Sequence, residues 1–474
     1  MKVATNTISP LQHWARKSPD CLALITTERD YSWQALEQTV QSYVYLLQQH
    51  GLAKGDVLTC VAKNSPELVL LYLACMELGA VCAITMPQPS ASLQGKLHTL
   101  YSEQQLPLVW LADAPPSLEL EAIKTVDLNR FKQHPNQHQV ELGDGGYQDS
   151  ALASIIFTSG STGTPKAVAH CHQQHFASAS GLLDIFKFNA QDTWLLSLPM
   201  YHVSGLAIIY RWLHSGACLK VGCGDLLSDI DGVTHASLVA TQLSRLLESG
   251  QPLSLTHVLL GGSHVPLSLS QQAAKQGIET WLGYGMTEAA STVTAKQIDA
   301  DYSAGKTLKG RKVELREGRI FIGGDTLASG YYQQGSLTPI KDELGWFDSK
   351  DLGIWSIKHE LVIKGRADNQ FISGGENIHC EEIEQALNAH PDIQQALIVP
   401  IEDAEFGARP IAFVQSTLPI EQIDFSQWLA SRLVKFKHPK HYLTLPNCLF
   451  SGGIKVSRKD LKDWVTANTD FTVI

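Results

Sequence analysis

Several features that would assign this chain to a particular class are missing. Its nine cysteines are scattered from Cys21 to Cys448 without a CxxC pair, which favours reduced thiols over a disulfide framework. The most apolar stretch, residues 68–76, is interrupted by Glu77 and is too short to cross a bilayer. No apolar segment follows Lys2, so we expect no signal peptide. These absences predict a cytoplasmic protein without membrane insertion.

Charge is also scarce, and there is no basic surplus. Charged residues make up 18% of the 474 residues, and 47 Asp plus Glu against 37 Lys plus Arg give a formal net charge of −10. Because nucleic-acid binders normally carry a basic surplus, we expect no nucleic-acid partner. The chain exceeds the usual size of one cooperative core, so two or more domains are expected. The sequence leaves open whether the chain forms a homo-oligomer.

Residues 1–367 alternate helical and strand patterns. Residues 66–78 begin with Pro and precede Gly79, as expected of a helix. Similar strand-and-helix units recur at residues 193–198, 236–247 and 256–260. Such alternation predicts an α/β fold with largely parallel sheets.

The pattern changes near residue 366. Short elements follow: a helix at 381–389, strands at 394–400 and 411–415, and a helix at 425–436. This α+β order predicts a small, mobile C-terminal domain over residues 368–474, after a large N-terminal domain over residues 1–367. Residues 425–459 contain no acidic residue. That pattern fits either a solvated basic face or a surface that docks on anionic phosphates.

A loop rich in glycine and hydroxyl groups, TSGSTGTPK, follows an apolar strand at residues 153–157. Glycine lets the backbone approach a ligand, hydroxyl and N–H groups donate to phosphate oxygens, and Lys adds positive charge. It is not a Walker A loop, because Pro165 precedes the Lys. We predict a phosphate site made by Thr158, Ser159, Gly160, Ser161, Thr162, Gly163 and Lys166.

This loop resembles the signature of the adenylate-forming superfamily, which includes acyl-CoA ligases, peptide-synthetase adenylation domains and luciferases. Five further motifs are similar and come in the same order: GGS at 261–263, GYGMTE at 283–288, GWFDSKDLG at 345–353, GRAD at 365–368 and GGIKVSR at 452–458. The resemblance implies a large multi-sheet adenylate-forming domain, followed by a small domain that carries the catalytic lysine.

The resemblance also implies a role for each motif. Catalytic roles fall to Thr287 at the α-phosphate, Glu288 as the Mg²⁺ ligand and Lys455 between the substrate carboxylate and phosphate, and His202 is expected to belong to the same catalytic set. Mg²⁺ binding by one carboxylate plus phosphate oxygens agrees with the chemistry of that ion. The implied ATP/AMP-binding residues outside the loop are Gly261, Gly262, Ser263, Tyr284, Gly285, Thr287, Asp351, Arg366 and Lys455, and Asp368 is the implied hinge.

The implied reaction has two steps: a carboxylic acid and ATP give an acyl-adenylate and pyrophosphate, and a thiol then displaces AMP. The only near match to a carrier-protein site, GGDTL at 323–327, lies inside the predicted large domain. A free thiol, coenzyme A, is therefore expected as acceptor, alongside ATP and Mg²⁺. All partners expected are small molecules.

Two residues bear on the acid. His202 stands where peptide synthetases carry an Asp for the amino group, which argues against an amino acid; in the family it gates the acyl pocket, although a hydrogen-bonded structural His is equally open. Arg211 interrupts the apolar run 205–213 and needs a counter-charge. That charge is either an Asp or Glu of the protein or a second carboxylate on the substrate.

Further segments resemble the o-succinylbenzoate–CoA ligases of bacterial menaquinone biosynthesis: WLLSLP at 194–199, YHVSG at 201–205, RWL at 211–213, THASLV at 234–239 and ASTV at 290–293. The resemblance implies an AMP-forming acid–thiol ligase in which Arg211 holds the benzoate, with Thr241, Gln242 and Ser291 as further pocket candidates. Two alternatives stay open: another aryl- or fatty-acyl-CoA ligase, and a non-catalytic nucleotide-binding regulator.

Two local features do not change this interpretation. Asp348, Ser349 and Lys350 precede Asp351 where many relatives have His-Thr-Gly, so we expect altered loop geometry rather than altered function. His170, Cys171, His172 and His175 are crowded as in a metal site. Relatives often carry His in this stretch without metal, and we expect no zinc.

Overall fold

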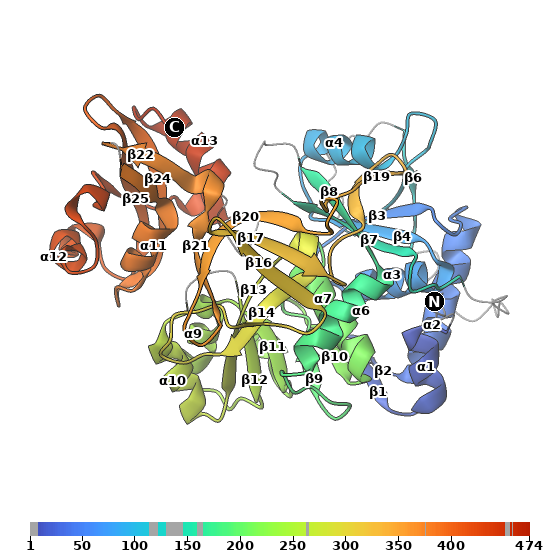
Figure 1. The fold of residues 1–474 in the computed structure, drawn as a ribbon. Coiled ribbons are helices and arrows are strands. Elements are labelled where there is room, and N and C mark those ends of the chain that lie inside the picture. The colour runs from blue at the N-terminus through green and yellow to red at the C-terminus, as the bar shows by residue number, and fades with distance from the viewer. Residues whose placement is uncertain are drawn as a thin grey trace.

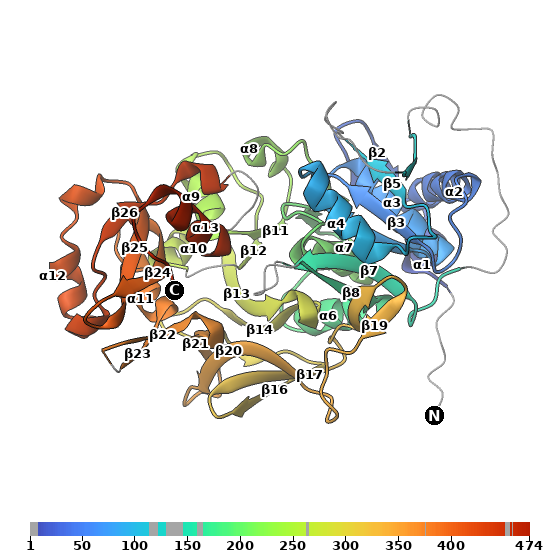
Figure 2. The same cartoon turned by 90° about the horizontal axis from the view of Figure 1, so that it is seen from above.

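A computed structural model describes residues 8–112, 122–128, 146–158, 165–261, 265–374, 376–450, 456 and 458–474. Within these ranges helices and strands form a mixed α/β structure with several sheets, which confirms the predicted fold class (Figure 1). The large part, which runs from blue to the orange strands β20 (Phe347–Trp355) and β21 (Leu361–Arg366), lies beside a smaller orange-to-red part (Figure 1). From above, α13 (Arg458–Asn468) of the smaller part overlaps α9 (Ala240–Glu248) and α10 (Leu267–Lys275) (Figure 2). No helix in the described ranges is long and apolar enough to cross a membrane.

The first sheet of the large part carries the predicted phosphate loop. Its core strands β5, β3, β4 and β7 run parallel, so their carboxyl ends meet at one edge. Such an edge is the usual ligand site of α/β sheets. The strands, in spatial order, are β19 (Ser336–Thr338), β18 (Gly330–Gln333), β8 (Lys166–Cys171), β7 (Leu152–Thr158), β4 (Val81–Thr85), β3 (Val57–Val61), β5 (Leu108–Leu111) and β6 (Lys124–Thr125).

A second sheet includes the three strand-and-helix units expected from the sequence, with strands slightly shorter than predicted. Its strands β9, β11, β12 and β13 are parallel, and β13 turns back into antiparallel β14. The spatial order is β15 (Lys306–Thr307), β14 (Ser291–Gln297), β13 (Glu279–Met286), β12 (His257–Leu260), β11 (His235–Leu238), β9 (Thr193–Leu195), β10 (Cys218–Lys220), β1 (Leu22–Ile25) and β2 (Asp30–Ser32).

Apolar helices form the core that joins these sheets. In α3 (Pro66–Leu78) every residue from Leu68 onward is buried, and Gly79 ends the helix at φ 73°, as the sequence predicted. The same core cluster includes α2 (Trp33–Gln49) and α7 (Val203–Ser215). The remaining helices of the large part are α1 (Pro10–Lys17), α4 (Ser90–Leu100), α6 (His172–Leu183), α8 (Leu226–Asp229), α9 (Ala240–Glu248) and α10 (Leu267–Lys275).

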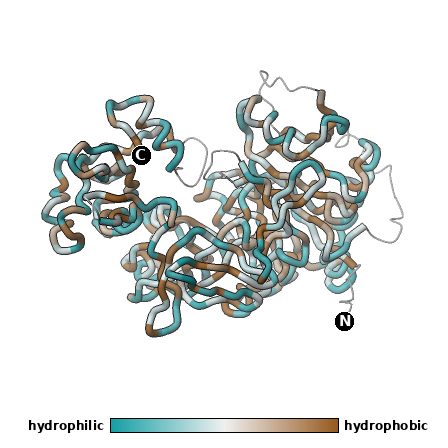
Figure 3. Tube along the Cα trace, turned by 45° about the horizontal axis from the view of Figure 1, so that its top comes forward, coloured by the Kyte–Doolittle hydropathy of each residue, from teal (hydrophilic) through white to brown (hydrophobic). Residues whose placement is uncertain are grey.

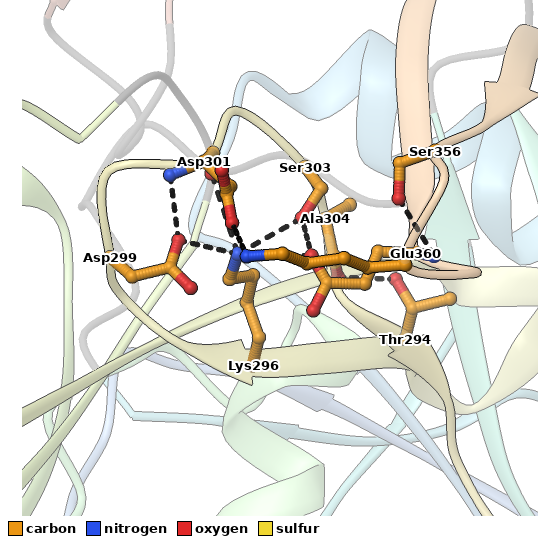
Figure 4. A network of polar contacts seen from close by, with 9 residues as sticks. Thr294, Lys296, Asp299, Asp301, Ser303, Ala304, Ser356 and Glu360 are labelled. Carbon is orange, nitrogen blue, oxygen red and sulfur yellow. Dashed lines mark hydrogen bonds and ion pairs between the residues drawn. The ribbon is translucent and has the colours of Figure 1, made fainter.

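A third, antiparallel sheet consists of β16 (Arg311–Arg316), β17 (Arg319–Gly324), β20 (Phe347–Trp355) and β21 (Leu361–Arg366). A buried lysine links it to β14. Nζ of Lys296 lies 2.6 Å from an oxygen of Asp299 and 3.1 Å from one of Glu360, and it also donates to Ser303 (Figure 4). Here the protein itself supplies carboxylates to a buried cation.

Hydrophobic residues from Phe371 onward form two core clusters of their own, and hydrophobic segments lie inside both parts (Figure 3). The predicted helix at 425–436 is wrong beyond Ala430: Arg432 donates to the carbonyl of Trp428, and a short 3₁₀ turn follows at Lys435–Lys437. The elements are β22 (Gln370–Ser373), β23 (Glu376–His379), α11 (Cys380–Asn388), β24 (Ile393–Asp403), β25 (Gly407–Ser416), α12 (Phe425–Ala430), β26 (Tyr442–Thr444) and α13 (Arg458–Asn468).

Candidate active site

The predicted phosphate loop joins two paired strands. Thr158, at the end of β7, lies opposite Lys166, at the start of β8, in the antiparallel ladder. The exposed Lys166 has its Nζ 4.9 Å from the ring centre of Tyr331 on β18. Ser159, Gly160, Ser161, Thr162 and Gly163 lie outside the described residues. The ladder thus brings the first and last residues of the motif together at the carboxyl edge of the first sheet.

The turn between β13 and β14 holds the two predicted catalytic residues of the GYGMTE motif. Thr287 and Glu288 lie in a 3₁₀ turn, η1 (Thr287–Ala289), and both are half-buried. The hydroxyl of Tyr331 donates to Oε1 of Glu288 at 3.3 Å. Tyr331 therefore contacts both Glu288 and the Lys166 side chain, although no spacing in the sequence indicated this residue.

The backbone after this turn is strained and closely packed. Ala290 and Ser291 have φ values of 50° and 94°, a region that non-glycine residues rarely occupy and that recurs at functional sites. Gly285 lies directly against this segment, since a Cβ at that position would stand 1.8 Å from the carbonyl oxygen of Ser291. Glycine at 285 is thus required for the close approach of the two strands.

Asp351 is held by donors from two different elements. Its Oδ2 accepts a hydrogen bond from Tyr284 at 2.5 Å, and its Oδ1 lies 3.2 Å from Nη1 of Arg366. Burial raises the pKa of Asp351, while both partners oppose that shift. Lys350 adopts φ 66°, and the hydroxyl of Ser349 accepts from the Asp351 N–H. The unusual residues before Asp351 therefore still support a regular, paired carboxylate.

Arg366 is also paired with the predicted hinge residue. Its Nε and Nη2 donate to the two oxygens of Asp368 at 2.8 and 2.9 Å. This bidentate pair raises the pKa of Arg366 and lowers that of Asp368. The predicted ribose-binding arginine thus connects Asp351 in the large part to Asp368 at the junction of the two parts.

The predicted adenine segment begins at the end of β12, where Gly261 is described and half-buried. Gly262 and Ser263 lie outside the described residues, as does Lys455. Their roles stay predictions.

At the other end of the site, α7 carries both residues that bear on the acid. His202 is the N-cap residue of this helix and is an exposed residue. Surrounding protein atoms and the charge of Lys96 lower the pKa of His202. Arg211, two turns further on, is only 2% exposed. The helix therefore places one solvent-facing and one buried residue of the predicted acyl pocket.

In the described part of the chain Arg211 has no Asp or Glu partner, which was one of the two expectations for its counter-charge. Among the described residues no carboxylate lies within ion-pair distance of its guanidinium. Its Nη2 reaches the Thr292 hydroxyl at 3.4 Å, and its Cζ lies 5.2 Å from the ring centre of Trp194. Its Nε has no acceptor among the residues that the structure describes. Burial lowers the pKa of Arg211 to about 9, with a smaller contribution from Arg311. A buried guanidinium with so few acceptors favours an anionic ligand.

The three weaker pocket candidates differ in their surroundings. Ser291 is buried, with its hydroxyl 3.5 Å from that of Thr292, and so shares a neighbour with Arg211. Thr241 is exposed on the first turn of α9. The amide oxygen of Gln242 accepts from the Val239 N–H at 3.0 Å, which assigns Gln242 a helix-capping contact. The structure thus brings only Ser291 close to Arg211.

The crowded histidines are buried among aromatic and hydroxyl groups. His175 is hydrogen-bonded to Ser154 at 2.8 Å, and His172 to Tyr210 at 2.9 Å. Burial lowers the pKa of His170 to about 4 and of His172 to about 3. Within the described ranges no three His, Cys, Asp or Glu residues are arranged to hold a metal ion. These neutral rings pack behind α7 on its Tyr210 side.

Three described basic residues of the stretch 425–459 form ion pairs with carboxylates. Lys437 bonds to Glu382 at 2.7 Å, and Lys440 to Asp403 at 2.8 Å. Arg458 spans Glu381 and Glu384 at 3.0 and 2.5 Å. These ion pairs offset part of the positive charge of the stretch, which favours the interpretation of a solvated basic face over a phosphate-docking surface.

Comparison with known proteins connects this geometry to a family. The model of the AMP-binding enzyme family matches residues 11–332, and that of the AMP-binding enzyme C-terminal domain matches residues 382–448. The chain belongs to the AMP-binding enzyme family. This family places three described features in an AMP-binding enzyme: the pairing of Thr158 with Lys166, the turn at Thr287 and the hydrogen-bonded cluster around Asp351.

Relatives within the AMP-binding enzymes share the full length of the chain. A 2-succinylbenzoate–CoA ligase of Salmonella typhimurium is 39% identical over 465 residues, covering 97% of this chain and 98% of the relative. A 2-succinylbenzoate–CoA ligase of Escherichia coli is 38% identical, covering 96% of this chain and 98% of the relative. Among solved structures, a variant of E. coli MenE with bound OSB-AMS gives a TM-score of 0.87 at 36% identity, covering 97% of this chain and 98% of that one.

A more distant structure is o-succinylbenzoate coenzyme A synthetase (MenE) of Bacillus subtilis in complex with ATP and a magnesium ion. It is 26% identical, with a TM-score of 0.82 over 92% of this chain and 95% of that chain. The resemblance to adenylate-forming enzymes inferred from six motifs is confirmed.

Proposed function

We propose that this protein is an AMP-forming acid–thiol ligase that makes o-succinylbenzoyl-CoA from o-succinylbenzoate, ATP and coenzyme A, as a step of menaquinone biosynthesis. The observation that carries the choice of acid is Arg211, a buried guanidinium without a carboxylate partner among the described residues. o-Succinylbenzoate has two carboxylates. One reacts at phosphorus, and the other remains to pair with Arg211. The full-length similarity to 2-succinylbenzoate–CoA ligases supports the same choice.

In the first step, an oxygen of the succinyl carboxylate attacks the α-phosphorus of ATP. The acyl–phosphate bond forms as the bond to the β-phosphate oxygen breaks, so pyrophosphate leaves. The two reactants are both anionic, and the site must therefore offset charge in the transition state. We assign this work to Lys455, to Thr287 and to the loop from Thr158 to Lys166. Glu288 is the carboxylate that would hold Mg²⁺, whose charge would offset that of the phosphates.

Asp351 and Arg366 are assigned to the ribose. A carboxylate with a donor on each oxygen is fixed in orientation and still has lone pairs for ribose hydroxyl groups. In the second step the sulfur of coenzyme A attacks the acyl carbon, and AMP leaves with the bonding electrons. Rotation of residues 368–474 about Asp368 would exchange the Lys455 segment for the thiol between the steps.

The test is ATP–pyrophosphate exchange with a panel of acids, followed by mass detection of the CoA thioester. The panel contains o-succinylbenzoate, benzoate, a medium-chain fatty acid and an amino acid. Exchange that is strongest with o-succinylbenzoate, together with its thioester, is expected. Exchange with benzoate or the fatty acid but not with o-succinylbenzoate would identify a different acyl-CoA ligase. No exchange and no thioester with any acid would favour the nucleotide-binding regulator.

A further inference from the structure

A lysine that belongs to none of the motifs lies at the edge of the first sheet. Lys96 is on α4, and its Nζ donates to the hydroxyl of Thr85 at 2.5 Å. The same Nζ is 5.0 Å from the ring centre of Phe157. Thr85 and Phe157 directly follow Ile84 and Ile156, which are paired in the parallel strands β4 and β7. The ammonium group is thus at the carboxyl edge of two adjacent parallel strands.

This position is next to the start of the phosphate loop. Phe157 precedes Thr158, the residue paired with Lys166. Lys166 approaches from β8 and lies against Tyr331, whereas Lys96 approaches from α4 on the side of Phe157. Two cations from different elements therefore flank the strand ends from which the loop emerges.

The charge of Lys96 is not neutralised by a carboxylate in the described part of the chain. Its side chain is half-buried, and burial lowers its pKa to about 8. An ammonium group has three donors, and only the Thr85 hydroxyl accepts from it among the described residues. Next to burial, the charge of Lys96 also lowers the pKa of His202, at the start of α7. By contrast, the buried Lys296 has carboxylates of both Asp299 and Glu360.

From this placement we propose that Lys96 binds the β- or γ-phosphate of ATP and the pyrophosphate released from it. The inference rests on the proposed function, and it adds a contact that the sequence motifs do not contain. Partial burial with few acceptors leaves the ammonium available for an anion, and the neighbouring loop is a predicted phosphate site. The second carboxylate of the acid is already assigned to Arg211 on α7, so Lys96 is not needed for that group.

The test compares two nucleotides that differ in the β- and γ-phosphates. Affinities of α,β-methylene-ATP with Mg²⁺ and of AMP are measured by titration calorimetry for the wild type, Lys96→Met and Lys96→Arg. Because a charge-assisted hydrogen bond is lost, Lys96→Met should bind the ATP analogue about tenfold or more weakly. AMP affinity should stay the same, which also shows that the variant is folded. Lys96→Arg should recover much of the loss.

A matched control is Lys275→Met, which removes an exposed lysine at the end of α10 and should change neither affinity. Unchanged affinity of Lys96→Met for the ATP analogue, or an equal loss for both nucleotides, would refute the phosphate contact. A higher KM for the acid with unchanged nucleotide affinities would assign Lys96 to the acyl pocket instead. These outcomes need a wild type that binds the ATP analogue; a wild type that binds neither nucleotide would overturn the proposed function itself.

Discussion

Two buried arginines lie within reach of each other's charge and have very different surroundings. Arg311, on β16, donates to the carbonyl oxygens of Thr292, Ala177, Lys309 and Ser178 and to the Ser178 hydroxyl. Arg211, on α7, has one contact at 3.4 Å and an Nε without an acceptor among the described residues. Neither has a carboxylate partner there.

The difference separates a structural cation from a cation that awaits a ligand. The fold surrounds Arg311 with acceptors that replace its hydration, so its burial is compensated within the protein. Arg211 loses its hydration without equal compensation, and an anion in the pocket would supply it. Lys296 shows that the same protein places carboxylates beside a buried cation elsewhere (Figure 4).

The largest expected effect tests whether charge is costly in this interior. His170, His172 and His235 are buried, and burial lowers the pKa of His170 and His235 to about 4 and of His172 to about 3. The unfolded chain takes up these protons near pH 6.5, whereas the folded protein does not. The contribution of these neutral histidines to the free energy of unfolding is therefore complete above pH 6.5 and is lost as the pH decreases toward 4. We expect a loss of about 2 kcal/mol per histidine at pH 5.

Urea unfolding at pH 8, 7, 6 and 5 measures this loss. Burial raises the pKa of Glu77 to about 7, so this carboxyl stabilises the fold as the pH falls and offsets part of the loss. A free energy of unfolding that rises toward pH 5 would mean that the buried rings accept protons without cost. The argument about Arg211 would then lose its physical basis.

The second prediction concerns removal of Arg311, the arginine whose burial is compensated by acceptors of the protein. Arg311→Met removes the donors for carbonyls on α6, on β14 and in the segment before β16, leaving these groups buried without partners. We expect a loss of about 4 kcal/mol in the free energy of unfolding. Chemical denaturation of the apoprotein measures it. A change below about 1 kcal/mol would show that the acceptors around Arg311 contribute little.

The third prediction concerns the stability of the apoprotein without Arg211. Arg211→Met replaces a poorly paired buried charge by an apolar side chain of similar length, a change that is often neutral or stabilising. We expect the free energy of unfolding to stay within about 1 kcal/mol of the wild type or to rise. The same denaturation series checks this. A loss as large as that of Arg311→Met would mean that Arg211 is also structural.

The smallest effect is expected at a paired cation in the small part. Lys437 bonds to both oxygens of Glu382 at 2.7 Å, and Glu382 is exposed enough for solvent to screen the pair. Lys437→Met should cost less than about 1 kcal/mol and leave the KM for coenzyme A unchanged. A clear rise in that KM would instead support the interpretation of the basic stretch as a phosphate-docking surface.

Much of the fold could be predicted from the sequence where local rules are strong. Pro66 and Gly79 delimit α3 because proline favours a helix start and Gly79 adopts a positive φ. The helix predicted from Phe425 ends at Ala430, and beyond it the Arg432 side chain, rather than the backbone N–H of Arg432, donates to the Trp428 carbonyl. The hydrophobic periodicity of a sequence does not show which side chains will bond to backbone carbonyls at the end of a helix.

The site was predictable where contiguous motifs carry it and not where distant residues meet. Asp351 and Arg366 were found from their motifs, and the structure pairs them. Tyr331 and Lys96 were missed, because their contacts depend on which strands are adjacent rather than on spacing in the chain. That none of the described carboxylates lies beside Arg211 could likewise be seen only in the packed structure.

One kinetic cycle tests the central claim that Arg211 holds the second carboxylate of the substrate. The kcat/KM values for adenylation are measured with o-succinylbenzoate and with the same acid lacking its ring carboxylate, in the wild type and in Arg211→Met. We predict that the wild type prefers o-succinylbenzoate by about 30-fold or more and that the variant loses this preference, a coupling of about 2 kcal/mol. If Arg211→Met lowers both values equally, the ring carboxylate is bound elsewhere and the assignment of Arg211 is wrong.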